Sequence, residues 1–253
     1  MSSKKDKLFM KLALDLASQR DGLTGPNPSV GCVIVKNNQI ISIGQTGING
    51  RPHAEYNAIK NCKKKIKGST IYISLEPCSH YGMTPPCTDL IIRSKIKKVF
   101  FAINDIDRRS SKKAKKILNY NKIIVKSFLL KKEAKKLYTP YFFTKSKKIP
   151  YVTGKIAKSK DNYIYFNKKK ITNNYSLSLS HILRYFNQGI LVSANTLNSD
   201  NPKLTCRIKG LEKFSPKRFI LDKNLICKKN LQLISNAKKI KTYIFFNKKK
   251  RKK

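Results

Sequence analysis

Three possible zinc ligands constrain the fold of this chain most strongly, because one ion can bind them only if the fold brings their side chains together. They are His53, which begins the triplet His53-Ala54-Glu55, and two later cysteines, Cys78 and Cys87. One imidazole and two thiols can hold zinc and leave its fourth position open for water. The sequence therefore predicts that residues far apart along the chain converge on a single metal site.

The residues around these ligands favour catalysis over a purely structural role. Glu55 lies two positions after His53, where its carboxylate can move protons between the water and a substrate without binding the metal. Cys87 follows Pro85-Pro86 at the expected start of a helix, whose free N–H groups and positive dipole end favour a thiolate. This combination is typical of zinc-dependent base deaminases, which replace an exocyclic amine on a heteroaromatic ring with oxygen.

Length and cysteine content limit the remaining possibilities. A chain of 253 residues allows one large domain or two modest ones. No apolar run reaches the roughly 18 residues of a membrane span, and the N-terminus has no apolar signal segment. We therefore expect a cytoplasmic protein without a membrane partner. In such a chain the six cysteines do not predict a disulfide framework.

The formal net charge of +43 points at first to a nucleic-acid partner. However, the lysines are spread over the whole chain and accompany many asparagines and isoleucines, as a compositional bias at tolerant surface positions would produce. The basic tail 247–253 is similarly interpreted as a solvated chain end. We expect no specific nucleic acid as partner. A basic nucleic-acid-binding or nucleic-acid-editing protein is the alternative from another functional class.

Apolar periodicity predicts helices that alternate with strands, the pattern of an α/β layer sandwich. In the first block we expect helices over 7–19, 53–64, 87–94, 112–118 and 131–137, and strands over 30–35, 39–43, 70–75, 98–103 and 123–128. In the second block we expect strands over 151–156, 189–192, 218–221 and 242–246, and a helix over 177–186. A lysine-rich candidate linker at 145–150 separates the blocks and predicts domains 1–146 and 147–253.

The segment that contains the two cysteines discriminates among deaminases. Cytidine and transfer-RNA adenosine deaminases close the site with Pro-Cys-x-x-Cys, whereas here the second cysteine comes six positions later, in LEPCSHYGMTPPC at 75–87. This segment resembles the bifunctional riboflavin-biosynthesis deaminase/reductase family. The resemblance extends to PNPSVGCVIV at 26–35 and GRPHAE at 50–55, and these motifs cover most of residues 8–107.

The resemblance implies a cytidine-deaminase-like three-layer α/β/α sandwich with Zn²⁺ as cofactor. Its expected reaction is the hydrolytic deamination of 2,5-diamino-6-ribosylamino-4(3H)-pyrimidinone 5′-phosphate to 5-amino-6-(5-phosphoribosylamino)uracil. His53, Cys78 and Cys87 would bind the metal, and Glu55 would be catalytic. The residues implied to contact this small pyrimidine nucleotide are Asn27, the Ala54 backbone, His80 on the ribose-phosphate side, and Asp105 at the ribosyl chain.

Two departures from the family pattern concern the substrate phosphate. Met83 stands where the family usually carries a lysine or arginine. The family's Asp-Pro-x-Pro motif is replaced by Asp105-Ile106-Asp107-Arg108. Arg51 or Arg108 could supply the missing positive charge, and the sequence leaves both possibilities open.

The second block resembles the family's dihydrofolate-reductase-like reductase domain, through residues 155–162, 181–184, 189–197 and 200–207. The residues that this resemblance assigns to substrate or NADPH are Lys155, Ser159, Asp161, Arg184, Asp200, Asn201, Leu204 and Arg207. The family's later glycine-rich segment is not found before residue 253. We therefore expect an incomplete reductase-like α/β domain, which does not reduce the deaminated product by itself. We also expect the chain to form a homo-oligomer. The alternative is a bifunctional chain that also uses NADPH.

Overall fold

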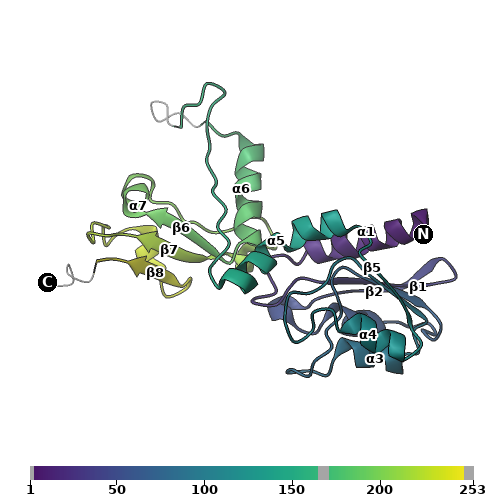
Figure 1. Cartoon of the computed structure of the whole chain (residues 1–253). Coiled ribbons are helices and arrows are strands. Elements are labelled where there is room, and N and C mark those ends of the chain that lie inside the picture. Colours follow the sequence, from purple (N-terminus) through teal and green to yellow (C-terminus); the bar gives the residue numbers. More distant parts are fainter. Residues whose placement is uncertain (1–2, 165–170, 248–253) are drawn as a thin grey trace. The chain divides into compact units, whose positions relative to one another are not determined.

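The computed structural model describes residues 3–164 and 171–247 of the chain. The chain divides into two compact units, Met1–Thr153 and Gly154–Lys253 (Figure 1). Each unit has its own sheet and its own buried core. The first unit contains all the residues that the sequence predicts for the deaminase site.

Five strands form the sheet of the first unit, in the spatial order β2-β1-β3-β4-β5. Their bounds are Gly31–Lys36 for β1, Gln39–Gln45 for β2, Thr70–Ile73 for β3, Lys98–Phe101 for β4 and Ile124–Ser127 for β5. β1 pairs antiparallel with β2 and β3, whereas β3, β4 and β5 run parallel. The β1–β2 hairpin turns at Asn37 and Asn38, whose positive φ values of 49° and 60° asparagine tolerates.

Helices cover both faces of this sheet and make it the middle of three layers. α1 (Lys4–Ser18) and α5 (Lys131–Lys147) pack on one face. α2 (Ala54–Lys60), α3 (Cys87–Arg93) and α4 (Ala114–Tyr120) pack on the other. Side chains of β1 alternate accordingly, with Val33 and Val35 facing the first group and Cys32 and Ile34 the second. The predicted three-layer sandwich is confirmed.

Helix α2, which follows His53, lies unusually close to β2. A Cβ atom added at Gly44 would come within 2.2 Å of the Ala54 carbonyl oxygen and 2.5 Å of the Ala58 nitrogen. Two hydrogen bonds fix the same contact, from Ser42 Oγ to the Ala58 carbonyl at 2.6 Å and from Asn57 Nδ2 to the Gln45 carbonyl at 2.8 Å. The depth of α2 on the sheet is therefore set by the absence of a side chain at Gly44.

We expect Gly44→Ala to lower the free energy of unfolding by at least about 2 kcal/mol, because a methyl group there must push backbone atoms apart. Urea denaturation followed by circular dichroism measures the change. Gly154→Ala is the matched control, since a Cβ atom at Gly154 would meet nothing within 4 Å. Equal stability of the two variants would show that α2 moves freely on the sheet.

Helix α5 is longer than the sequence predicts. The expected helix over 131–137 continues to Lys147, through the first part of the candidate linker at 145–150. Pro140 lies inside this helix and removes one backbone donor. A proline at this position favours an earlier helix end when the sequence is considered alone. Packing of Tyr138, Tyr141 and Phe142 against the core overrides that signal.

The second unit contains a three-stranded parallel sheet, in the order β6-β7-β8. Its strands are β6 (Gly189–Ser193), β7 (Lys217–Leu221) and β8 (Thr242–Phe245), and its helices are α6 (Asn174–Phe186), α7 (Ala194–Asp200) and α8 (Gln232–Ser235). Leu197, Leu204, Ile220, Leu231 and Leu233 form its buried core. The described residues also include two short 3₁₀ helices, Ile48–Gly50 in the first unit and Glu212–Phe214 in the second.

The strand predicted over 151–156 is wrong. These residues have no regular secondary structure and pair with no strand of the described chain, and the apolar side chains of Val152 and Ile156 are 83% and 66% exposed. Apolar residues form a strand only where a neighbouring strand takes their backbone hydrogen bonds. Across the described ranges, no helix has both the length and the apolar character that crossing a bilayer requires.

Candidate active site

The three predicted zinc ligands come from three separate segments of the first unit. His53 is the N-cap residue of α2, and Cys87 is the first residue of α3. Cys78 lies in the loop that follows β3. Two contacts hold this loop against α3, from the Thr88 N–H to the Cys78 carbonyl at 3.1 Å and from the Cys87 N–H to Cys78 Sγ at 3.2 Å. The fold thus brings the three side chains together.

The separations of the ligand atoms fit a tetrahedral zinc ion. His53 Nδ1 lies 3.3 Å from Cys87 Sγ and 3.6 Å from Cys78 Sγ, and all three ligand atoms lie within 4.8 Å of one another. Zinc bound at about 2.3 Å from sulfur and about 2.0 Å from nitrogen, with tetrahedral angles, places nitrogen and sulfur about 3.5 Å apart. One imidazole and two thiols also form the soft donor set that zinc prefers.

The two thiols differ in their protonation. A hydrogen bond from the Cys87 thiol, together with His53 and the Cys87 backbone N–H, lowers the pKa of Cys78 to about 4. The pKa of Cys87 is raised, because this thiol donates to Cys78 and because it is buried. Cys78 is therefore the group that carries a negative charge first, next to an imidazole. The hydrogen bond with Cys78 raises the pKa of His53, so zinc binding would release protons from this imidazole and from the Cys87 thiol.

Glu55 is buried beside the ligand cluster, with only 3% of its surface exposed. Burial raises the pKa of this carboxyl, while the charge on His53 lowers it and that on Cys78 raises it again. A carboxyl group whose pKa is raised holds a proton more readily and can both accept and return it. Its position in the first turn of α2 directs it to the same site as His53.

Asn27 is held beside the site by Gly50. Asn27 Nδ2 donates to the Gly50 carbonyl at 3.4 Å. Gly50 has a φ of +89°, and an added Cβ atom there would come within 2.3 Å of Asn27 Nδ2. Only glycine fits this approach. Ala54 is fully buried and begins α2, so its backbone N–H is one of the donors without a partner inside the helix.

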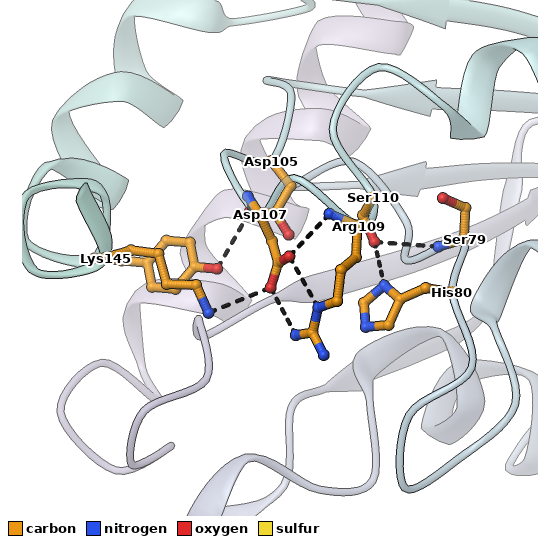
Figure 2. A network of polar contacts seen from close by, with 8 residues as sticks. Ser79, His80, Asp105, Asp107, Arg109, Ser110 and Lys145 are labelled. Carbon is orange, nitrogen blue, oxygen red and sulfur yellow. Dashed lines mark hydrogen bonds and ion pairs between the residues drawn. The ribbon is translucent and has the colours of Figure 1, made fainter. Parts of the chain in front are cut away.

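His80 contacts the loop after β4 through Ser110 (Figure 2). His80 Nδ1 lies 2.7 Å from Ser110 Oγ, and the same oxygen accepts a hydrogen bond from the Ser79 N–H at 3.3 Å. The half-buried His80 thus stands between the loop that carries Cys78 and the loop that carries Asp105. Sequence reasoning missed Ser110, because nothing in the chain pattern pairs a serine with a histidine 30 positions earlier.

Asp105 and Asp107 organise the loop after β4 (Figure 2). Asp105 Oδ1 accepts hydrogen bonds from the Asp107 N–H at 3.1 Å and from the Tyr141 hydroxyl at 3.2 Å. Burial raises the pKa of Asp105. Asp107 binds the Arg109 guanidinium through both oxygens and also pairs with Lys145 of α5 at 3.2 Å. These cations, Arg109 foremost, lower the pKa of Asp107.

Glu76 is a second residue that the sequence did not single out. Its buried carboxylate accepts backbone N–H groups of Asp105 at 3.2 Å, Lys112 at 3.0 Å and Ala114 at 3.2 Å. Burial raises its pKa, and these three donors act against that effect. The one feature of the sequence that could have indicated a role for Glu76 in the site is its position directly before Pro77-Cys78.

The insert between the cysteines has an exposed tip. The Met83 side chain is 85% exposed. Arg51 Nη1 donates to Thr84 Oγ1 at 2.8 Å, which places this guanidinium against the same loop. Arg108 is exposed, and no hydrogen bond or ion pair holds its side chain among the described residues. Of the two arginines that the sequence offered as phosphate contacts, Arg51 is the one fixed to the insert.

The residues expected to contact substrate or cofactor in the second unit fall into two groups. The Arg184 side chain and the Arg207 backbone meet near His181: Arg184 Nη1 donates to the Thr205 carbonyl, and the Arg207 backbone N–H donates to His181 Nδ1, both at 3.1 Å. Burial and the charge of Arg207 lower the pKa of Arg184. No carboxylate among the described residues pairs with either arginine.

The other expected residues of the second unit have local roles. Asn201 Oδ1 accepts the Gln232 N–H at 2.9 Å, and Asp200 accepts the Ser199 hydroxyl at 2.8 Å. Leu204 is a core residue, which leaves its backbone as the part available to a ligand. Lys155, Ser159 and Asp161 lie in a segment without regular structure, and in the described ranges no hydrogen bond joins them to α6 or α7. The structure therefore does not bring Lys155, Ser159 or Asp161 to Arg184 and Arg207.

Two family models match this chain, one in each unit. The model of the cytidine and deoxycytidylate deaminase zinc-binding region matches residues 3–103, and that of the RibD C-terminal domain matches residues 150–253. The fold and the His/Cys/Cys cluster thus define a zinc-binding domain of the cytidine deaminase type, followed by a second, mixed α/β domain.

Individual relatives identify the family. The riboflavin biosynthesis protein RibD of Aquifex aeolicus is 42% identical over 223 residues, which cover 87% of this chain and 62% of that protein. RibD of Bacillus amyloliquefaciens is 37% identical, with 92% and 63% covered. The Thermotoga maritima diaminohydroxyphosphoribosylaminopyrimidine deaminase/5-amino-6-(5-phosphoribosylamino)uracil reductase matches with a TM-score of 0.87 at 36% identity, covering 96% of this chain and 70% of that one.

The chain belongs to the RibD family. It spans less than two thirds of the length of the curated relatives from Aquifex and Bacillus. The family resemblance drawn from residues 75–87, 26–35 and 50–55 is confirmed, together with the two-domain fold class that it implied.

Proposed function

We propose that the first unit is a zinc-dependent deaminase of 2,5-diamino-6-ribosylamino-4(3H)-pyrimidinone 5′-phosphate, with 5-amino-6-(5-phosphoribosylamino)uracil and ammonia as products. The observation that carries this proposal is the convergence of His53, Cys78 and Cys87 beside the buried carboxyl of Glu55. The deaminase activity in the name of the Thermotoga relative supports the choice of substrate.

The site residues divide the reaction between them. A zinc ion held by His53, Cys78 and Cys87 would act as a Lewis acid that makes water nucleophilic near neutral pH. Glu55 takes a proton from the attacking water and passes it to the departing amine, so that water enters and ammonia leaves. The raised pKa of Glu55 suits a group that must hold the proton between these two steps.

Five further residues are proposed to orient the substrate. The Asn27 amide offers a carbonyl acceptor to the amino side of the pyrimidine, since its Nδ2 is already engaged by Gly50. The first N–H groups of α2, at Ala54, reach the ring edge. Asp105 offers its second carboxylate oxygen to ribosyl hydroxyls, and His80 lies on the ribose-phosphate side. Arg51, fixed to the insert, supplies the positive charge that Met83 lacks.

Incubation of the purified, zinc-loaded protein with the diaminopyrimidine nucleotide tests this function. Mass spectrometry should detect the replacement of one amine by oxygen, and a coupled assay should detect one ammonia for each product formed. Cytidine and deoxycytidylate serve as control substrates and should remain unchanged. Deamination of the controls with no reaction of the diaminopyrimidine nucleotide would contradict the proposal.

We propose for the second unit a phosphate-binding role of Arg184 and Arg207. Burial and the positive charge of Arg207 lower the pKa of Arg184, so the two guanidinium groups lie near enough to repel each other, and a bound anion would relieve this repulsion. The deaminated product carries such a phosphate. Adding NADPH to the same incubation tests whether this unit is also a reductase. We expect the deaminated product to remain unchanged. Formation of a reduced, ribitylamino product would establish the bifunctional alternative.

We also propose a cytoplasmic homo-oligomer. All six cysteines are free, which fits a reducing compartment. In the second unit α6 buries none of its side chains and leaves Leu177, Leu179 and Leu183 between 38% and 43% exposed, a surface suited to contact with another copy. Analytical ultracentrifugation measures the oligomeric state.

We expect any binding of DNA or RNA to be weak, independent of sequence and abolished by about 200 mM salt, because it would rest on phosphate contacts of scattered lysines. The net charge of +43 is the observation that makes this alternative worth testing. Filter binding of duplex and single-stranded oligonucleotides over a salt series provides the measurement. Tight binding that persists at this salt concentration and prefers one sequence would instead favour a nucleic-acid-binding or nucleic-acid-editing protein.

A further inference from the structure

The hydroxyl group of Ser110 occupies a fully buried position between two loops of the candidate active site. Its oxygen lies 2.7 Å from His80 Nδ1 and 3.3 Å from the Ser79 nitrogen (Figure 2). The Ser79 group is a backbone N–H and therefore donates to this oxygen. His80 Nδ1 is the group whose role, donor or acceptor, depends on which ring nitrogen carries the hydrogen.

Burial decides the direction of the bond between Ser110 and His80. Among the described residues, His80 Nδ1 is the one acceptor that contacts the Ser110 hydroxyl. If Nδ1 carried a hydrogen, the hydroxyl hydrogen of Ser110 would be buried without a partner, at a cost that proteins generally avoid. The Ser110 hydroxyl therefore donates to Nδ1, which places the hydrogen of the ring on Nε2.

The loop that carries Ser110 is held firmly enough to impose this choice. The Ser110 N–H donates to the Asp107 carbonyl at 2.9 Å, and the Lys113 N–H donates to the Ser110 carbonyl at 3.0 Å. Asp107 is itself bound by Arg109 and by Lys145 (Figure 2). The serine oxygen is thus positioned by the protein before any ligand arrives.

We propose that Ser110 is a positioning residue that fixes the tautomer and orientation of His80, so that Nε2–H is a preset hydrogen-bond donor to an oxygen of the substrate. Nε2 has no hydrogen-bond partner within the described part of the chain. An added Cβ atom at Gly82 would lie 3.9 Å from Nε2, so the insert passes beside this nitrogen without bonding to it. The substrate half of this inference rests on the proposed deaminase function, and the tautomer half does not.

Nuclear magnetic resonance of the zinc-loaded protein labelled with ¹⁵N-histidine tests the tautomer directly. The chain has three histidines, and a His80→Gln protein assigns the signal of interest. The ¹⁵N signals of the neutral His80 ring should show the hydrogen on Nε2. Ser110→Ala should give a mixture of both tautomers, and Ser110→Thr, which keeps a hydroxyl, should restore the Nε2–H form.

Steady-state kinetics tests the consequence for the substrate. We expect Ser110→Ala to raise KM for the diaminopyrimidine nucleotide by about two- to tenfold, the range of one hydrogen bond, with kcat changed much less. Ser111→Ala is the matched control, because Ser111 is the adjacent serine and contacts Asp107 through its backbone only. This control should keep both the tautomer and KM.

The two measurements distinguish the effect of Ser110 on the His80 tautomer from its effect on substrate binding. Hydrogen on Nδ1 in the unchanged protein, or a tautomer that Ser110→Ala leaves as it was, would overturn the inference without any kinetic measurement. A shifted tautomer with unaltered KM would overturn the role in substrate binding. If the unchanged protein deaminates nothing, the proposed function fails, and the magnetic resonance comparison still decides whether Ser110 sets the tautomer. Since the first measurement needs no substitution at Ser110, a poorly folded variant does not prevent the test.

Discussion

The Glu55→Gln protein is expected to keep its zinc and to lose deamination by roughly 10²-fold or more, the scale of general acid–base catalysis. Glutamine preserves the size of the side chain and can still donate and accept hydrogen bonds, but it takes up no proton at neutral pH. Glu55 is buried beside the ligand cluster, so bulk water is excluded from replacing it directly. Turnover of the diaminopyrimidine nucleotide and metal analysis of the same samples provide the two measurements.

Glu133→Gln is a suitable control for this experiment, since it makes the same chemical change on the exposed surface of α5. Its activity should equal that of the unchanged protein. Activity of Glu55→Gln within a few-fold of the unchanged protein would remove Glu55 from the mechanism. A loss of zinc in that variant would instead assign Glu55 to the support of the metal.

The Cys87→Ala protein is expected to lose most of its zinc and, with it, essentially all deaminase activity. Three protein ligands are needed to retain zinc while a fourth position stays open. Cys87 also orients the other thiol, because its backbone N–H and its thiol both donate to Cys78. Inductively coupled plasma mass spectrometry should find close to one zinc per chain in the unchanged protein and a small fraction of that in the variant.

Cys62→Ala is the matched control for the metal experiment. Cys62 lies in the same unit, partly exposed, and its thiol contacts backbone carbonyls rather than the ligand cluster. This control should keep full zinc and full activity. Undiminished zinc in Cys87→Ala, or equal losses in both variants, would rule out the proposed ligand set.

The sequence predicted the first unit more accurately than the second because its local signals agree with its tertiary structure. The continuous apolar run at 30–35 is a local feature, and the strand that it predicts occurs as β1, buried along almost its whole length. The helix starts at Cys87 and after His53 follow from neighbouring prolines. By contrast, the strand expected over 151–156 needs a partner strand, which no local pattern reveals.

The candidate site shows the same division between local and long-range information. Metal ligands are recognisable because their chemistry restricts residue type and spacing, and the structure brings His53, Cys78 and Cys87 together. The supporting residues are different. Ser110 and Glu76 act through contacts with residues about 30 positions away, and serine and glutamate are common at many surfaces. Such partners become identifiable only when the fold has placed them.

Glu76 has a consequence for how the first unit moves. It stands two residues before Cys78, and its carboxylate holds three N–H groups of the segment from Asp105 to Ala114. A fluctuation that lifts that segment must therefore strain the loop that carries Cys78, and the reverse also holds. The two loops should therefore fluctuate as one cooperative unit on the timescale of local unfolding, so that a single carboxylate couples the rigidity of the loop that carries Cys78 to that of the segment after β4.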